Sequence, residues 1–358
     1  MDSLTQIVLG AAVAAVIAPA RHRRAALLAG AALGTLPDLD VIPTHLLLDD
    51  PVDRLTWHRG PSHSLLVLPL LAWAIWAFFK RRGGRVTESP RRWWWAILLA
   101  LVTHPLLDAF TVFGTQLLWP LPSRPEMWSS LFIIDPLYTL WLLAACIAAW
   151  ILRDKPSAQT WLVAGLAVSS AYIGWSLLAK SMADRAASQS LAAMGLADAP
   201  RFSVPMPFNT LLWRVVAMTP EGYVEGYRSV LIDRGPMRFT AYPSDVAALR
   251  EAGDIRNVRR LGWFNRDFQR AQVADGRLVL TDLRMGSEPD YIFKWAVAAH
   301  DADGGWVALQ PAEQLREPEG RSRMMRMGET WQRIWAEPVT GDERAQAASG
   351  TPATSESK

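Results

Sequence analysis

The stretch QTWLVAGLAVSSAYIGWSLL, residues 159–178, contains no charged residue. A helix needs about 20 such residues to cross the hydrocarbon core of a bilayer. The stretch therefore predicts a membrane-spanning helix. It also marks a change in composition, because the chain before it is strongly apolar and the chain after it has an ordinary soluble composition. Hydrophobic residues make up 51% of the whole chain, which is high for a soluble protein.

Several apolar segments precede this stretch. Residues 64–79, 93–110 and 131–152 are further candidates for membrane spans. Two shorter segments, 4–19 and 25–36, are open to three interpretations: they span a thin region, re-enter the membrane or pack inside the bundle. Both are rich in small residues, which predicts a close approach between helices. The glycines among them are Gly10, Gly30 and Gly34.

The second half of the chain predicts a different structure. Alternating apolar segments predict strands at 211–218, 223–232, 277–285 and 291–299, and helices are expected at 244–252 and 321–337. The polar tail 341–358 is predicted to be disordered. The expected fold class is mostly α: a polytopic membrane helix bundle at 1–178, followed by a small soluble α+β domain at 179–340.

Charge predicts an orientation for this bundle. Basic residues gather in alternate loops, and the opposite loops, 37–63 and 111–130, hold only Arg54, Arg59 and Arg124. By the positive-inside rule, the basic loops are cytoplasmic and the opposite loops lie outside. We expect the C-terminal domain to lie outside as well. The net charge of +3 is too small to indicate a nucleic-acid partner. The basic residues are Arg21, Arg23, Arg24, Lys80, Arg81, Arg82, Arg85, Arg91, Arg92, Arg153 and Lys155.

Carboxylates and imidazoles occur in pairs at the outer ends of the apolar segments. Such groups are costly near a bilayer and are rarely found there without partners. Asp and His are also common ligands of divalent metals such as zinc. The pairs therefore predict a metal centre on the outer side of the membrane. They are Asp38 and Asp40 in LPDLD, His58 and His63 in HRGPSHS, and His104 and Asp108 in THPLLDAF.

Each pair also has a structural interpretation. His104 and Asp108 are four residues apart on one helix face, which suits two metal ligands or a buried hydrogen-bonded pair. His58 and His63 flank Arg59, whose fixed charge suits a phosphate or carboxylate, although the loop could simply face water. In the same loop, Ser62 is expected to cap a helix that starts near His63.

Two more positions carry alternatives. Asp38 and Asp40 are expected to point the same way from an extended turn, where they could bind metal, supply a general base or end a helix as solvated carboxylates. Asp135 is equally suited to complete the site and to cap the helix that begins at Pro136.

Taken together, these motifs resemble the YdjM-like family of membrane-bound metal-dependent hydrolases. The matching pieces are DSLTQ…G at 2–10, GTLPDLD at 34–40, HRGPSHS at 58–64, THPLLDAF at 103–110, FGTQLLWPL at 113–121 and IDPLYTL at 134–140. PFNTLLWRVV at 207–216 and LTDLRMG at 280–286 are similar to the longer members of that family.

The resemblance implies an enzyme of the bacterial inner membrane. The family is in turn similar to zinc-dependent phospholipase C and the S1/P1 nucleases, which cleave phosphodiesters with a zinc cluster. This chain has Thr5-Gln6 where a Thr-His pair is usual, and it lacks a later His-x3-Glu helix. The resemblance therefore implies one or two ions here rather than three.

These inferences together predict a multi-pass hydrolase whose metal site and C-terminal domain are extracytoplasmic. The expected cofactor is a divalent metal, zinc, as one or two ions. Asp40 is expected to act as a general base and Arg59 to hold an anionic group of a phosphoester or phospholipid substrate. The expected partners are the lipid bilayer and that substrate. The alternatives are a non-catalytic protein with a structural metal and an ion-coupled transporter. The predicted metal ligands are Asp38, Asp40, His58, His63, His104 and Asp108.

Overall fold

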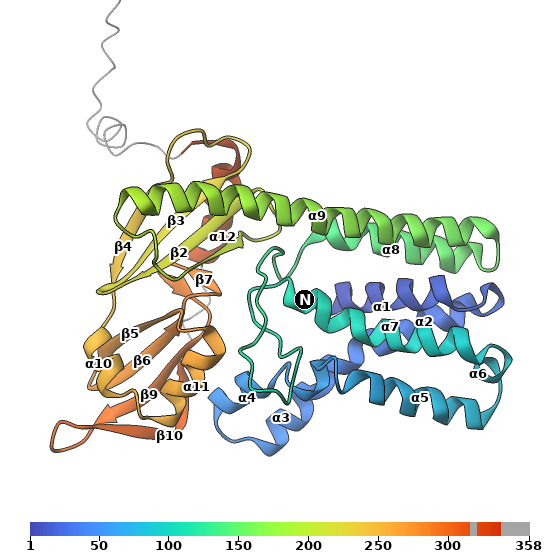
Figure 1. Ribbon diagram of the computed structural model, residues 1–358, viewed down its shortest axis with the longest axis horizontal. Coiled ribbons are helices and arrows are strands. Elements are labelled where there is room, and N and C mark those ends of the chain that lie inside the picture. The colour runs from blue at the N-terminus through green and yellow to red at the C-terminus, as the bar shows by residue number, and fades with distance from the viewer. Residues whose placement is uncertain (316–320, 338–358) are drawn as a thin grey trace, which may run out of the picture.

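The computed structural model describes residues 1–315 and 321–337. A helical region lies at one end of the molecule and two β-sheets lie at the other (Figure 1). The predicted disorder of 341–358 falls outside the described residues. The boundaries predicted for the two domains stay a prediction, and the long helix α9 runs without a break through residue 178.

The helical region is built from the first half of the chain, and every predicted apolar segment contributes a helix to it. The elements are α1 (Ser3–Ile17), η1 (Ala20–His22), α2 (Arg23–Thr35), η2 (Leu36–Asp40), α3 (Val41–Leu47), α4 (Pro51–Trp57), η3 (Pro61–His63), α5 (Leu68–Arg82), α6 (Arg85–Glu88), α7 (Pro90–Ala109), α8 (Pro136–Leu152) and α9 (Pro156–Ala193).

Two stretches of the described chain are long and apolar enough to cross a membrane by themselves: Ala20–Leu47 and Pro156–Ala193. A third candidate is the pair Pro51–His63 and Leu68–Arg82, which is bent by 57°. Helices α1 and α8 are apolar but shorter. The helical region thus contains candidate spans, including the segment 25–36 that the sequence left open.

The closest helix contact is between α1 and α2, and glycine makes it. A Cβ atom built on Gly10 would lie 2.3 Å from the carbonyl oxygen of Gly30, and one on Gly34 would lie 2.3 Å from that of Gln6. No side chain fits at such distances, so the predicted close approach is confirmed. The contact matters for the site below, because it brings Gln6 and the backbone of Gly34 together.

Helix α9 links the two ends of the molecule. At 38 residues it is about 57 Å long, so its first half lies beside α8 and its second half reaches the sheets (Figure 1). There, Ala179, Ala183 and Ala187 recur every four residues and are fully buried. They pack against the first sheet, including Trp213 and Val215 of β2.

The C-terminal region contains two four-stranded antiparallel sheets. Their strand orders are β1-β2-β3-β4 and β10-β9-β6-β5, and β7 pairs with β8 separately. The predicted strands correspond to β2, β3, β6 and β9, while the others were not predicted. The elements are β1 (Arg201–Pro205), β2 (Leu212–Thr219), β3 (Gly222–Ser229), β4 (Phe239–Pro243), α10 (Val246–Glu251), α11 (Arg256–Asn265), β5 (Gln269–Ala274), β6 (Arg277–Asp282), β7 (Gly286–Ser287), β8 (Asp290–Tyr291), β9 (Lys294–His300), β10 (Trp306–Leu315) and α12 (Arg321–Trp335).

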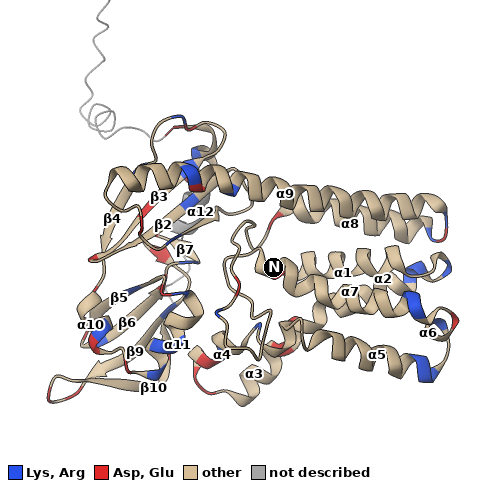
Figure 2. Ribbon diagram, in the orientation of Figure 1, with Lys and Arg blue, Asp and Glu red and all other residues tan. Residues whose placement is uncertain are grey.

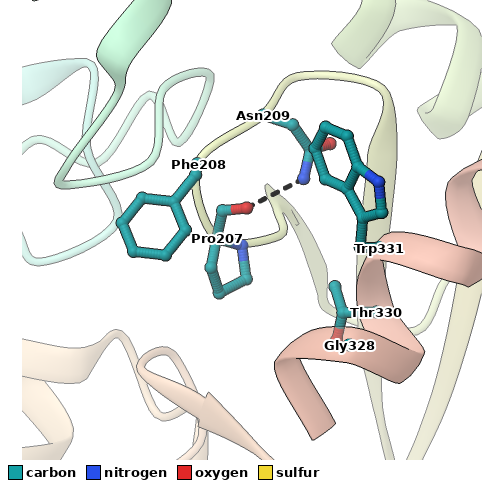
Figure 3. A pocket seen from close by; sticks show the side chains of 6 residues that line it. All are labelled: Pro207, Phe208, Asn209, Gly328, Thr330 and Trp331. Carbon is teal, nitrogen blue, oxygen red and sulfur yellow. Dashed lines mark hydrogen bonds between the residues drawn. The ribbon is translucent and has the colours of Figure 1, made fainter. Parts of the chain in front are cut away.

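A hollow of about 290 Å³ lies between the β1–β2 loop and α12 (Figure 3). Its lining includes Pro207, Phe208 and Trp331, and none of the lining residues that the structure describes has a titratable side chain. A site that performs acid–base or metal chemistry must therefore be sought elsewhere. The region between the helices and the sheets, where η2, η3 and the end of α7 meet, holds the predicted Asp and His residues.

Candidate metal centre

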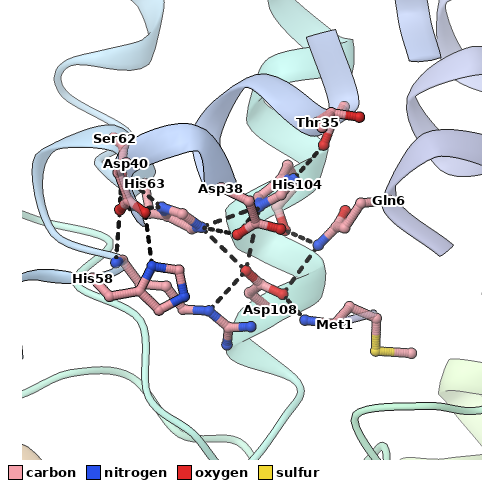
Figure 4. A network of polar contacts seen from close by, with 12 residues as sticks. Met1, Gln6, Thr35, Asp38, Asp40, His58, Ser62, His63, His104 and Asp108 are labelled. Carbon is pink, nitrogen blue, oxygen red and sulfur yellow. Dashed lines mark hydrogen bonds and ion pairs between the residues drawn. The ribbon is translucent and has the colours of Figure 1, made fainter. Parts of the chain in front are cut away.

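Four of the six predicted ligands come together at the sheet-facing end of the helices (Figure 4). Each offers one ligand atom, and these atoms lie within 4.8 Å of one another. They come from η2, η3 and α7, which are far apart in the sequence but adjacent in the fold. The four residues are Asp38, His63, His104 and Asp108.

The spacing of these atoms fits a tetrahedral metal. The Nε2 atoms of His63 and His104 are 3.1 Å apart. Asp38 Oδ1 lies 3.4 Å from each of them, and Asp108 Oδ2 lies 3.3 and 3.4 Å from them. Ligands about 2.0–2.1 Å from a tetrahedral zinc are separated by about 3.3 Å. Five edges of the tetrahedron therefore match, and the sixth, between the two carboxylate oxygens, is no longer than 4.8 Å, so the residues fit a four-coordinate cation in a distorted tetrahedron.

The two imidazoles are also held in the form that binds metal. His104 Nδ1–H donates to the carbonyl oxygen of Gly34 at 2.6 Å, which leaves its Nε2 lone pair facing the site. Ser62 donates to Asp40 at 2.6 Å, so its oxygen accepts from His63 Nδ1 at 2.9 Å. The His63 Nε2 lone pair consequently faces that of His104. Two facing lone pairs repel each other unless a cation or a proton lies between them.

The two carboxylates of the cluster also have oxygens that accept no hydrogen bond. Asp38 Oδ1 and Asp108 Oδ2 are buried and have no hydrogen-bond partner. The other oxygen of Asp108 accepts from Gln6 Nε2 at 3.0 Å and contacts the N-terminal amine of Met1. Buried polar atoms nearly always form hydrogen bonds, so two oxygens that accept none, beside two imidazole lone pairs, indicate a place for a cation.

Asp40 and His58 form a second pair next to this cluster. Asp40 accepts hydrogen bonds from His58 Nδ1 at 2.7 Å, from the backbone N–H of Arg59 at 3.0 Å and from Ser62. The His58 ring centroid lies 6.0 Å from that of His63. The group of four ligand atoms does not include either residue.

The local backbone explains why the two aspartates separate. The expectation of an extended turn at 36–40 is wrong, because this segment is the 3₁₀ helix η2. With three residues per turn, residues two apart point in different directions. Asp38 therefore faces the imidazoles of His63 and His104, while Asp40 faces His58. The expected capping role of Ser62 is also wrong, since its hydroxyl bonds Asp40 and His63 instead.

Arg59 lies between the cluster and a neighbouring loop. It adopts a left-handed backbone, with φ of 61°, and it is only 4% exposed. Its Nε lies 3.2 Å from Asp108 Oδ2, and its guanidinium lies over the ring of Phe113 at 4.8 Å. The arginine thus places a positive charge directly beside the carboxylate that also faces the imidazoles.

Asp135 does not join the group of four. Its side chain accepts from the backbone N–H groups of Leu137 and Tyr138 and from the hydroxyl of Tyr172. The capping interpretation is therefore confirmed. Gln6 and the carbonyl of Gly34 were not predicted to serve the site. The only sequence signal was that Gln6 occupies the position where the resembled family usually has a histidine.

The comparison with protein families supports the first half of this picture. The model of the YdjM inner membrane protein family matches residues 1–183. The chain belongs to this family. All four clustered ligands lie within the matched residues, as do the candidate spans up to residue 183. No curated protein and no solved structure matches the chain. The more distant similarity to phospholipase C and the S1/P1 nucleases therefore stays a prediction.

Proposed function

We propose that this YdjM-family protein is a multi-pass inner-membrane hydrolase that uses one divalent cation to cleave a phosphoester. The observation that carries the proposal is the group of four ligand atoms, in which two carboxylate oxygens accept no hydrogen bond and two imidazole lone pairs face each other. Histidine nitrogens and carboxylate oxygens in a tetrahedron suit zinc.

The proposed topology places the site outside the cytoplasm. Basic residues gather at the end of the helices that carries the α1–α2, α5–α6 and α8–α9 connections (Figure 2). The ligand cluster lies at the opposite end. By the positive-inside rule, the basic end faces the cytoplasm, and the cluster and the sheets face the other side. In this proposal, α1, α2, α5, α7, α8 and α9 form the bundle.

The chemistry would be divided between the cation and the chain. A bound cation that takes a water as a fifth ligand beside the four residues would lower the pKa of that water and polarise the scissile group. Asp38, His63, His104 and Asp108 would hold it. His58 donates its Nδ1 proton to Asp40, so its Nε2 is free to accept a proton from water. The side chain of His58 is 26% exposed, which leaves it accessible. Asp40 would then orient this base rather than take the proton itself.

Two features support an anionic, membrane-derived substrate. The guanidinium of Arg59 lies beside the cluster, where it would attract a phosphate once the cation balances Asp108. Helix α3 directly follows Asp40 and exposes large apolar side chains, including Leu46 and Leu47, each 79% exposed. An apolar helix at the level of lipid head groups would bring phospholipids close to the site.

The proposal is tested by metal binding and hydrolysis together. The purified protein is stripped of metal, titrated with zinc and assayed against phosphodiesters and phospholipids. We expect about one ion per chain, and we expect His104→Ala to lose more than about 100-fold in metal affinity, since changes outside the ligand shell already cost 10–100-fold. His45→Ala is the matched control, because His45 is exposed and, among the residues that the structure describes, its side chain bonds only the carbonyl oxygen of Val41.

Two results would contradict the proposal. Retention of metal and activity by His104→Ala would show that the cation binds elsewhere. Wild-type protein that binds zinc at these residues but cleaves no substrate would instead favour a structural metal in a non-catalytic membrane protein.

A further inference from the structure

At the end of the helices opposite the metal centre lies a hollow of about 350 Å³. It is formed where the connection between α1 and α2 meets the connection between α8 and α9. Arginine dominates its lining, and Asp154 is the one carboxylate among the lining residues. The lining residues are Ala20, Arg21, Arg23, Arg24, Arg153 and Asp154.

Buried Arg23 fixes the shape of the hollow. It is 3% exposed, and its guanidinium donates to the carbonyl oxygens of Arg153 and Lys155 and to Gln159 Oε1. These bonds join the start of α2 to the α8–α9 connection. Arg23 is therefore a structural part of the wall rather than a free charge.

The other three arginines have guanidinium N–H groups that form no hydrogen bond within the part of the chain that the structure describes. Arg153 is exposed, and within the described residues its side chain has no hydrogen-bond or ion-pair partner. Arg24 uses only its Nε, on the carbonyl oxygen of Trp150, and it lies over the Trp150 ring. Arg21 pairs with the exposed carboxylate of Glu88. Several guanidinium N–H groups thus converge on one hollow, which suits the oxygens of a phosphate.

Exposed apolar side chains lie on α2 and α8, next to these arginines in the sequence. Leu28 follows Arg24 by four residues on α2 and is 61% exposed. Ile147 and Ile151 precede Arg153 on α8, and they are 53% and 67% exposed. Trp150, which is partly exposed beside Arg24, is a residue typical of the membrane–water interface. Arginines above exposed aliphatic side chains match a molecule with a phosphate head and acyl chains.

We infer that this hollow binds the head group of an anionic phospholipid, with the acyl chains lying along α2 and α8. The shared chemistry is a phosphate, which free inorganic phosphate also offers. The exposed aliphatic side chains next to the arginines favour the lipid as its source. The inference does not depend on the metal centre or on hydrolysis.

The test counts bound lipids by native mass spectrometry of the detergent-purified protein during titration with phosphatidylglycerol or phosphatidylcholine. We expect the wild type to bind phosphatidylglycerol in preference to phosphatidylcholine. The variant Arg21→Gln/Arg24→Gln/Arg153→Gln should bind phosphatidylglycerol on the order of 100-fold more weakly. The matched control, Lys80→Gln/Arg81→Gln/Arg82→Gln, removes the same charge from the same end of the bundle and should bind almost as the wild type does.

Single Arg153→Gln serves if the triple variant does not fold, because within the described residues this side chain has no hydrogen-bond or ion-pair partner to lose. An equal loss in the control variant would show diffuse attraction to a basic surface and would overturn the inference. So would a wild type that does not distinguish the two lipids. A separate arm with inorganic phosphate decides the source: protection against thermal unfolding equal to that given by phosphatidylglycerol would assign the hollow to free phosphate.

Discussion

Two of the regions that bury charged side chains differ in how completely their carboxylate oxygens are hydrogen-bonded. Between the sheets, Asp282 accepts from Arg284 through both carboxylate oxygens. Glu225 likewise accepts hydrogen bonds through both oxygens: from Arg214 and Tyr291 through one, and from Tyr227 through the other.

The metal centre contrasts with this arrangement. Asp38 Oδ1 and Asp108 Oδ2 have no hydrogen-bond partner although they are buried. Both regions place charges out of water, where an unpaired group is costly. The difference teaches how a structural ion pair can be distinguished from a binding site: the former is complete within the protein, and the latter is completed by a ligand.

The largest effect is expected when the buried ion pair between Asp282 and Arg284 is broken. Asp282→Asn keeps the shape of the side chain but leaves the buried guanidinium of Arg284 without its counter-charge. We expect the free energy of unfolding to fall by about 3–5 kcal/mol, with or without metal. Denaturant unfolding in mild detergent measures it. Glu313→Gln is the control, because the exposed pair with Arg277 should contribute at most about 1 kcal/mol. If Asp282→Asn lowers the free energy of unfolding as little as this control does, the fully hydrogen-bonded pair does not stabilise the sheets.

The second largest effect is expected from binding of a cation at the candidate metal centre. A cation that binds only the folded protein should raise the free energy of unfolding by about 2.7 kcal/mol when present at 100 times its Kd. In His63→Ala this gain should vanish, since one of the four ligands is removed. Thermal unfolding with zinc and with a chelator measures the gain. An equal gain in wild type and His63→Ala would mean that zinc stabilises the protein from another position.

The residues of the cluster could be predicted from sequence because their chemistry is unusual beside apolar segments. His104 and Asp108 had a fixed relation, since residues four apart share a helix face. The division between Asp38 and Asp40 was not predictable, because it depends on η2 being a 3₁₀ helix rather than an extended turn. The role of the Gly34 carbonyl depends on how α2 packs against α7, which brings this backbone oxygen within 2.6 Å of His104.

The fold, too, could be predicted from sequence only in part. Apolar runs predicted where helices form in the first half, but not which of them continue through a break, as α2 does into α3. In the C-terminal region, the edge strand β4 was missed because none of its five residues is buried. The strands that were predicted, such as β2, are buried along most of their length and are correspondingly apolar.

A smaller effect should follow from Ser62→Ala. This change removes the acceptor that orients His63 Nδ1 but removes no ligand. Loss of such a supporting group should weaken metal affinity by about 10–100-fold. Ser64→Ala, in the same loop, is the control, because Ser64 bonds the carbonyl oxygen of Trp119 and not a ligand. Calorimetric titration with zinc compares the two. If both variants bind as the wild type does, Ser62 does not hold the imidazole in its binding form.

The smallest effect is expected from Asp38→Asn, which makes the same Asp-to-Asn change in the candidate metal centre. In metal-free protein, Asp38→Asn removes one of two crowded carboxylates and supplies an amide that can donate to the imidazole lone pairs of His63 and His104. Because Asp38 Oδ1 has no hydrogen bond to lose, the free energy of unfolding should change by less than about 1 kcal/mol. Zinc should then stabilise the variant far less than the wild type, since a charged ligand is gone. Denaturant unfolding with a chelator and with zinc separates these effects. A metal-free loss as large as that of Asp282→Asn would show that Asp38 is already a complete structural partner, and the distinction between the two regions would fail.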